Sequence, residues 1–165
     1  MNIQQNVLSE QLLVKLKAFT RDGKQPTQTN FFSYDKGITG FSNAVFGFTL
    51  SDELEKEVCQ ELLAKGIFET EPKDWKVFVH LMSRASFIPW HDDSTYVYTG
   101  TVYLNETWDK NWGGYFAYED GNEIKCIAPF YNQGCFFTPP IMHTALLTAG
   151  NAPLRESLQF FVREY

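Results

Sequence analysis

The chain has 165 residues, of which 44% are hydrophobic and 21% are charged. These values are typical of a globular protein, and we expect one domain over residues 1–165. The net charge of -6 argues against a broad polyanion-binding surface, so no nucleic acid is expected as a partner. The sequence contains no apolar run of about 18 residues and no secretion signal at its start, which predicts a cytoplasmic protein that makes no membrane contact.

Helical periodicity is confined to the first part of the chain. Apolar residues at helical spacing over residues 8–19 predict an amphipathic helix, with Ser9 as its N-cap and Asp22-Gly23 at its end. A second helix is expected to begin near Ser51 and to end at Lys65-Gly66. Both helices would need an apolar surface to cover.

Short alternating segments dominate the rest of the chain and predict β-structure. The high aromatic content of 16% favours the same class, or an aromatic-lined pocket. Some seven or eight strands after two helices predict a mostly β fold with N-terminal helices, of the sandwich or jelly-roll type. A hairpin signal lies at residues 119–122. The expected strands cover residues 75–84, 96–104, 115–118, 124–127, 134–137, 142–147 and 155–162.

The three cysteines suggest neither a disulfide framework nor a zinc cluster. Cys59, Cys126 and Cys135 are odd in number and have no CxxC spacing. Pairing of Cys126 with Cys135 across neighbouring strands is one alternative, but we expect buried free thiols.

A possible metal site begins at the segment Pro89-Trp90-His91-Asp92-Asp93, which ends a predicted strand. Strand residues two apart share one face, so His91 and Asp93 are expected to point to one side and Asp92 away from it. Alone, this motif also fits a solvated polar turn. With His143 it supplies two histidines and one carboxylate, the ligand set of non-haem iron(II) oxygenases, which leave coordination positions open. A structural zinc site would close its fourth position with Cys or His.

Arg155 is a candidate anion-binding residue. It shares a strand face with Ser157, so a guanidinium and a hydroxyl would converge inside the fold, where a carboxylate is the natural guest. The alternative is a surface ion pair of Arg155 with an acid such as Glu156 or Glu164.

In this order and spacing, His91-x-Asp93, His143 and Arg155-x-Ser157 resemble the iron(II)- and 2-oxoglutarate-dependent dioxygenases. The resemblance implies a double-stranded β-helix (jelly-roll) core over about residues 75–163, supported by a helical part over about residues 1–70. It also implies Fe(II) at the two histidines and the aspartate, which would be the catalytic residues.

The connecting sequence is similar to the prolyl 4-hydroxylase branch of that family. This similarity includes Tyr103-Leu104-Asn105, then Trp108 and Gly113-Gly114. It implies that 2-oxoglutarate, the cosubstrate, places its distal carboxylate on Arg155, with Tyr103 and Ser157 as further contacts. Tyr103 shares its expected strand face with two threonines, which form a more polar wall than the opposite face. O2 would be the second cosubstrate, and ascorbate a reductant.

The implied reaction is hydroxylation of an unactivated C–H bond, with oxidative decarboxylation of 2-oxoglutarate to succinate and CO2. Halogenating relatives have a small residue at the carboxylate position, so Asp93 favours hydroxylation. The first expectation for the substrate is a prolyl residue in a protein or peptide, with a free amino acid or another small metabolite as the alternative. Substrate-selecting loops are expected within residues 27–48 and 107–112. The hypothesis from another class is a non-catalytic cupin-like protein that binds a metal or a carboxylated ligand, against which Arg155 counts.

Four further residues have less specific signals. Trp90 and Trp112 either border a substrate groove or are simply packed. We interpret His80 as a core histidine, or one that supports the site, rather than as a ligand. The strand assignment alone does not say whether Arg84 faces inward.

Overall fold

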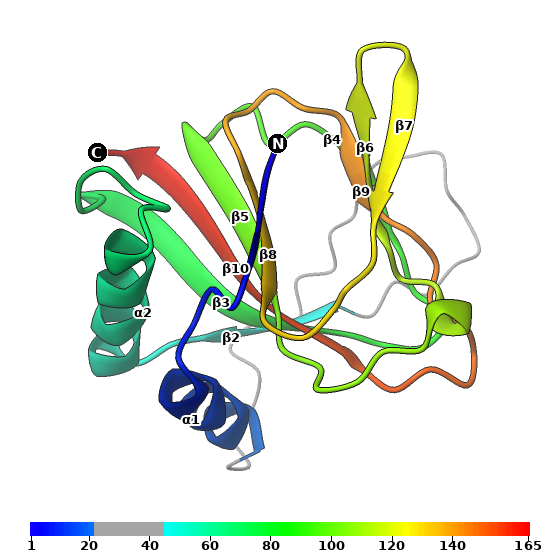
Figure 1. Cartoon of the computed structure of the whole chain (residues 1–165), viewed down its shortest axis with the longest axis horizontal. Coiled ribbons are helices and arrows are strands. Elements are labelled where there is room, and N and C mark those ends of the chain that lie inside the picture. The colour runs from blue at the N-terminus through cyan, green and yellow to red at the C-terminus, as the bar shows by residue number, and fades with distance from the viewer. Residues whose placement is uncertain (22–44) are drawn as a thin grey trace.

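Two antiparallel sheets build the protein, and the computed structural model describes residues 1–21 and 45–165 (Figure 1). The six-stranded sheet contains, in spatial order, β1 (Asn2–Gln5), β8 (Gln133–Phe137), β5 (Tyr98–Tyr103), β10 (Arg155–Glu164), β3 (Asp74–Met82) and β2 (Val45–Thr49). The four-stranded sheet contains β4 (Ile88–His91), β9 (His143–Ala145), β6 (Phe116–Asp120) and β7 (Glu123–Ile127). The predicted mostly β, jelly-roll class is confirmed.

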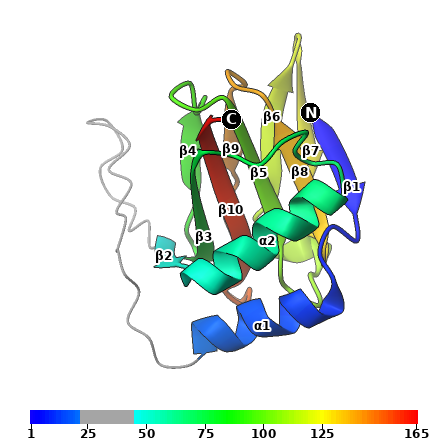
Figure 2. The ribbon, with the colours of Figure 1, turned by 90° about the vertical axis from the view of Figure 1, so that its left-hand side faces the viewer.

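Two helices, α1 (Glu10–Arg21) and α2 (Asp52–Ala64), cover the outer face of the six-stranded sheet (Figure 2). Their starts are where the sequence predicts them. The hydroxyl of Ser9 accepts a hydrogen bond from the backbone N–H of Leu12 at 3.2 Å, and that of Ser51 accepts one from Leu54 at 3.4 Å. The end of α1 expected at Asp22-Gly23 lies outside the described residues.

The central strand β10 separates the core from the inside of the fold by simple alternation. Leu158, Phe160 and Val162 are fully buried in the core beneath the helices. The residues between them, Gln159 and Phe161, line a pocket on the opposite face of the sheet. The face of β10 beneath the helices is therefore apolar. The face toward the second sheet carries both polar and apolar side chains.

The edges of the six-stranded sheet were not predicted. Strand β1 pairs with β8, and β2 pairs with β3. Residues 45–48, which were expected in a substrate-selecting loop, therefore belong to an edge strand. The rest of that expected loop, residues 27–44, lies outside the described part of the chain. The expected strand 75–84 ends earlier, at Met82, and Arg84 is exposed beyond it.

The hairpin expected at residues 119–122 is present, with Asp120 and Glu123 as the last paired residues of β6 and β7. All three cysteines are free, as expected, but only Cys59 and Cys135 are buried. The expectation of a buried thiol is wrong for Cys126, because β7 has β6 as its only partner in the described structure and leaves most of its residues exposed. Neither described helix is long and apolar enough to cross a membrane.

Candidate metal centre

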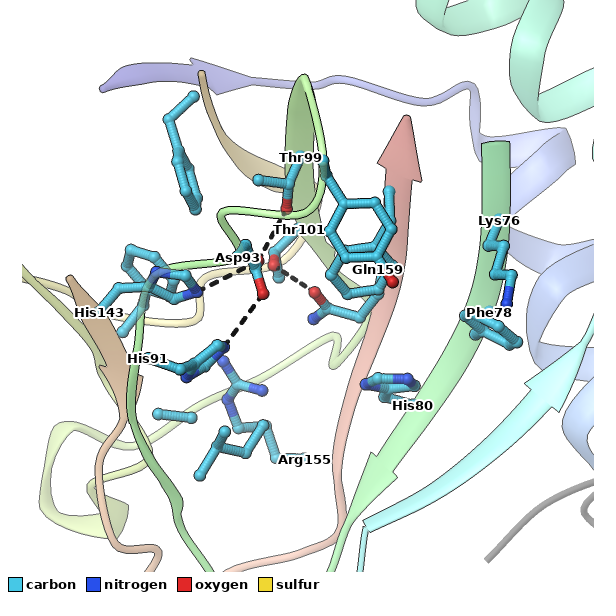
Figure 3. Close-up of a pocket in the computed structure, with 16 residues that line it drawn as sticks. Lys76, Phe78, His80, His91, Asp93, Thr99, Thr101, His143, Arg155 and Gln159 are labelled. Atoms are coloured by element: carbon cyan, nitrogen blue, oxygen red, sulfur yellow. Dashed lines mark hydrogen bonds and ion pairs between the residues drawn. The ribbon is translucent and has the colours of Figure 1, made fainter. Parts of the chain in front are cut away.

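Three side chains that can bind a metal meet where β4 and β9 pair. His91 ends β4 and lies opposite His143, the first residue of β9. His91 Nε2 is 3.6 Å from one carboxylate oxygen of Asp93, and His143 Nε2 is 3.4 Å from the other (Figure 3). One ligand atom from each of the three residues lies within 4.8 Å of the others. The structure thus brings together the three residues that the sequence selects.

Both imidazole rings are oriented by backbone carbonyls two residues earlier. His91 Nδ1 is 2.8 Å from the carbonyl oxygen of Pro89, and His143 Nδ1 is 2.7 Å from that of Ile141. A carbonyl can only accept a hydrogen bond, so Nδ1 carries the hydrogen in each ring. The lone pairs are then on the Nε2 atoms that face the carboxylate, which is the tautomer that metal ligation requires.

Asp93 reaches this point through a turn rather than through strand alternation. Strand β4 ends at His91, and Asp93 has a positive φ of 54°. Its carboxylate accepts a hydrogen bond from the Thr99 hydroxyl at 3.4 Å. Asp92 instead accepts from the backbone N–H of Ser94 at 3.1 Å, which lowers the pKa of its carboxyl. The expectation that His91 and Asp93 converge is met, but its stated geometric reason was wrong.

A cavity of about 170 Å³ lies in front of the three ligands and is lined by both sheets. Phe116 and Phe137 pack on His143 with ring centroids 5.2 and 4.9 Å away. Burial is the main cause that lowers the pKa of His91, followed by the neighbouring His143. A neutral imidazole is therefore favoured, as a metal ligand must be.

Arg155, the first residue of β10, lines the same cavity and is only 3% exposed. Its Nε donates to the carbonyl oxygen of Gly114 at 2.9 Å, and its guanidinium lies 5.0 Å from the ring centroid of Tyr103. In the described part of the chain it forms no ion pair, and Glu164 pairs with Lys73 instead. A buried guanidinium without an anion is costly, so this end of the cavity is suited to a carboxylate.

Tyr103 and Ser157 lie behind the cavity wall and are fully buried. The Tyr103 hydroxyl is 3.8 Å from the sulfur of Cys135, and burial raises the pKa of Tyr103 well above its usual value. The Ser157 hydroxyl accepts a hydrogen bond from the Gln159 amide at 3.0 Å. Tyr103 thus contacts the guanidinium of Arg155, and Ser157 forms a hydrogen bond with Gln159, which lines the cavity.

Residues that the sequence reasoning did not select complete the cavity. Gln159 and Phe161 follow Arg155 at strand period, a signal that could have identified them. Tyr96 was expected to begin the strand 96–104, but β5 begins at Tyr98, so strand period does not apply to Tyr96 and does not show that it lines the cavity. The lining residues that were missed are Lys76, Phe78, Ile88, Tyr96, Phe116, Phe137, Ala145, Gln159 and Phe161.

The less specific candidates divide between the cavity and the surface. His80 lines the cavity but does not belong to the metal-binding group of the described residues. Its burial lowers its pKa to about 4, helped by Arg155 nearby. Trp90 is 40% exposed and does not line the cavity, and Trp112 packs edge-on against Trp108 at 5.4 Å.

The sequence matches no protein-family model and no curated protein. Solved structures do match. A prolyl-4-hydroxylase of Pseudomonas putida aligns over 99% of this chain and 92% of its own, with a TM-score of 0.70 and 15% identity. A Trichoplax adhaerens prolyl hydroxylase, solved with a hypoxia-inducible factor oxygen degradation domain peptide fragment, aligns over 98% of this chain and 82% of its own, with a TM-score of 0.73 and 12% identity.

An oxidoreductase of the 2OG-Fe(II) oxygenase family from Burkholderia pseudomallei aligns over 97% of this chain and 82% of its own, with a TM-score of 0.65 and 16% identity. At these identities the similarity concerns the fold. The resemblance drawn from the sequence is thereby confirmed at that level: the chain has the jelly-roll fold of the iron(II)- and 2-oxoglutarate-dependent oxygenases, with prolyl hydroxylases among its structural neighbours.

Proposed function

We propose that the protein is an iron(II)- and 2-oxoglutarate-dependent dioxygenase that hydroxylates an unactivated C–H bond and releases succinate and CO2. One observation carries the proposal: the ligand atoms of His91, Asp93 and His143 lie within 4.8 Å at the wall of a cavity that also contains the buried Arg155. A metal-binding protein without this reaction, such as a cupin-like binding protein, does not need both features in one cavity.

The three residues fit iron(II) by their chemistry and their orientation. Two imidazole nitrogens and one carboxylate oxygen are the donors that such iron sites use, and they leave coordination positions open. Both Nε2 atoms are turned to the carboxylate by the carbonyls of Pro89 and Ile141. No cysteine or third histidine joins the group among the described residues, which favours an open site over a closed structural zinc site.

Arg155 is proposed to bind the distal carboxylate of 2-oxoglutarate. The Gly114 carbonyl accepts a hydrogen bond from Nε, and the Tyr103 ring lies against the guanidinium. Because no carboxylate of the described residues pairs with Arg155, its terminal nitrogens can bind the carboxylate of the ligand. Tyr103 and Ser157 are proposed as cosubstrate-site residues that act from behind this wall. Iron, when bound, supplies the activation of O2, with ascorbate as a reductant.

Three further residues of the cavity orient the ligands and exclude water from them. Thr99 holds one oxygen of Asp93, and Phe116 and Phe137 cover His143. The Asp93 carboxylate fills the position that halogenating relatives leave free for a halide, so hydroxylation is the proposed outcome.

The first proposal for the substrate is a prolyl residue in a protein or peptide, with a free amino acid or another small metabolite as the alternative. Two structural neighbours are prolyl hydroxylases, and one of them was solved with a peptide fragment. These neighbours support the class of substrate and do not identify its sequence.

Succinate formation from 2-oxoglutarate, with Fe(II) and ascorbate present, tests the reaction. We expect succinate from the native protein and none from His143→Ala. Mass spectrometry of peptide and amino-acid libraries then searches for the gain of one oxygen atom. Failure of the iron-loaded protein to bind 2-oxoglutarate would overturn the proposal.

A further inference from the structure

A row of three paired residues crosses the cavity floor from the metal ligands to a lysine. Thr99 on β5 pairs with Phe161 on β10, and Phe161 pairs with Lys76 on β3. All three line the cavity. Because Thr99 contacts Asp93, the metal ligands stand at one end of this row and Lys76 stands at the other (Figure 3). Adjacent strands are about 4.8 Å apart, so the backbones of Thr99 and Lys76 are separated by about 10 Å.

Arg155 lies too far along the strands to share a small ligand with Lys76. It pairs with Met82, whereas Lys76 pairs with Phe161, six positions further along β10. At about 3.3 Å per residue, this offset corresponds to about 20 Å of strand. A five-carbon dicarboxylate is much shorter than that distance. If Arg155 binds 2-oxoglutarate, Lys76 is therefore available to bind a second ligand.

The charges that line the cavity also leave Lys76 without compensation. Asp93 is the only carboxylate among the described lining residues, and Lys76 and Arg155 are the cations. With a divalent ion and the 2-oxoglutarate dianion bound, Asp93, Arg155, the ion and the cosubstrate sum to zero. Lys76, which is exposed at the rim of the cavity, then carries the one charge of the lining that these groups do not balance, although the whole chain has a net charge of -6.

The neighbours of Lys76 supply a wall but no counter-ion. Among the described residues none forms an ion pair with Lys76. Asp74, the next acid on the same face of β3, pairs with Arg163 at 3.8 Å. Phe161 packs against Tyr96 with ring centroids 4.9 Å apart. Lys76 is thus the strand partner of a residue that belongs to an aromatic surface lining the cavity.

We propose that the substrate carries a carboxylate, which pairs with Lys76 while Phe161 and Tyr96 cover its aliphatic part. This inference rests on the proposed function and names the class of its substrate. Lys76 and the metal ligands lie at the two ends of a row only three strands wide. The substrate must therefore have few bonds between the carboxylate that pairs with Lys76 and the carbon that is hydroxylated. A free amino acid meets this requirement, and so does an acidic residue next to the target residue of a peptide.

Binding of matched acids and amides tests the inference without turnover. The protein is loaded with Zn²⁺ in place of iron and with 2-oxoglutarate, and ligand-observed NMR measures the affinity of each probe. One arm compares small aliphatic amino acids, L-proline included, with their amides. The other arm compares peptides that contain Pro-Asp with peptides that contain Pro-Asn. We expect at least one acid to bind about tenfold more tightly than its amide, and the arm in which this occurs identifies the source of the carboxylate.

Substitutions then assign the preference to Lys76. Lys76→Gln should remove the preference, Lys76→Arg should keep most of it, and Lys65→Gln, which removes an exposed lysine outside this cavity, should leave it unchanged. Equal affinity of every acid and its amide for the native protein would overturn the inference, as would an acid preference that survives in Lys76→Gln.

The affinity for 2-oxoglutarate separates this inference from the proposed function. If the native protein binds 2-oxoglutarate and Arg155→Ala binds it at least about tenfold more weakly, the proposed cosubstrate site stands whatever the acid probes show. If no 2-oxoglutarate binds, the proposed function itself fails.

Discussion

Arg155 and Gly114 are joined by a hydrogen bond of 2.9 Å from the guanidinium Nε to the glycine carbonyl oxygen. The loop that presents this carbonyl is itself held, because Trp108 Nε1 donates to the carbonyl of Gly113 at 3.0 Å and the backbone N–H of Gly114 donates to that of Leu147. The guanidinium is therefore oriented before a ligand arrives. Pre-orientation of this kind reduces the entropy that binding costs.

Substitution of Arg155 should separate the cosubstrate from the metal. Arg155→Ala should weaken 2-oxoglutarate binding by about 1.5–3 kcal/mol, because a charge-assisted contact is lost, and should leave metal affinity nearly unchanged. Arg155→Lys should recover only part of the loss, since an ammonium cannot form the same two-pronged contact. Calorimetric titration of metal and then of 2-oxoglutarate measures both. Equal losses of the two affinities would point to damaged folding instead.

Gly114→Ala should reduce both stability and 2-oxoglutarate affinity. Gly114 has φ of +65°, and an added Cβ would lie 2.8 Å from Thr148 Cγ2 and 3.3 Å from Arg155 Cδ. The positive φ alone costs about 1–2 kcal/mol for a residue with a Cβ, and the crowding adds to it.

The matched control is Gly121→Ala, in the hairpin between β6 and β7. Gly121 has nearly the same φ, +63°, but its added Cβ would meet nothing within 4 Å. Urea unfolding should show a smaller loss of stability for this variant, and titration should show unchanged 2-oxoglutarate affinity. Similar behaviour of the two variants would show that the Gly114 loop does not orient Arg155.

His143→Ala should lower metal affinity by about 10-fold or more, because one of three ligands is lost. His80→Ala removes a buried histidine from the same cavity that does not belong to the metal-binding group, so it should retain most of the metal affinity. Titration of each folded variant with Fe(II) under anaerobic conditions makes the comparison. Comparable losses in both would contradict the assignment of the ligands.

Stability of the metal-free protein should fall as the pH is lowered from about 7 to 4, in part because of His80. Burial lowers the pKa of His80 from 6.5 to about 4. Between these values the unfolded chain binds a proton that the folded protein does not, so the free energy of unfolding decreases with falling pH. The full contribution is about 3 kcal/mol.

Urea unfolding of the native protein and of His80→Gln at several pH values isolates this contribution, since the other histidines remain in both. The difference in unfolding free energy between the two proteins should change from pH 7 to pH 4. A difference that is independent of pH would show that His80 titrates normally in the folded state.

The candidate metal ligands were predictable because their signal is chemical and ordered along the chain: His91 and Asp93 come early in the β-core, His143 late in it, and Arg155 at the start of the last strand. The helix starts were predictable because their causes are local, as the Ser9 and Ser51 caps are. Edge strands β1 and β2 lack such a local signal. They form strands because they pair with β8 and β3, which are distant in sequence.

The sequence by itself thus determined the residue types of the site, the class of fold and the face of β10 that carries Arg155, since these follow from composition, motif order and strand period. Only the tertiary structure decided how the parts meet. A turn, rather than the strand, aims Asp93, and Tyr103 lies behind the wall. Lys76 lies in the same row of paired residues as Thr99, which contacts the metal ligand Asp93. The register of β3, β10 and β5, set by hydrogen bonds between segments distant in sequence, produces this row.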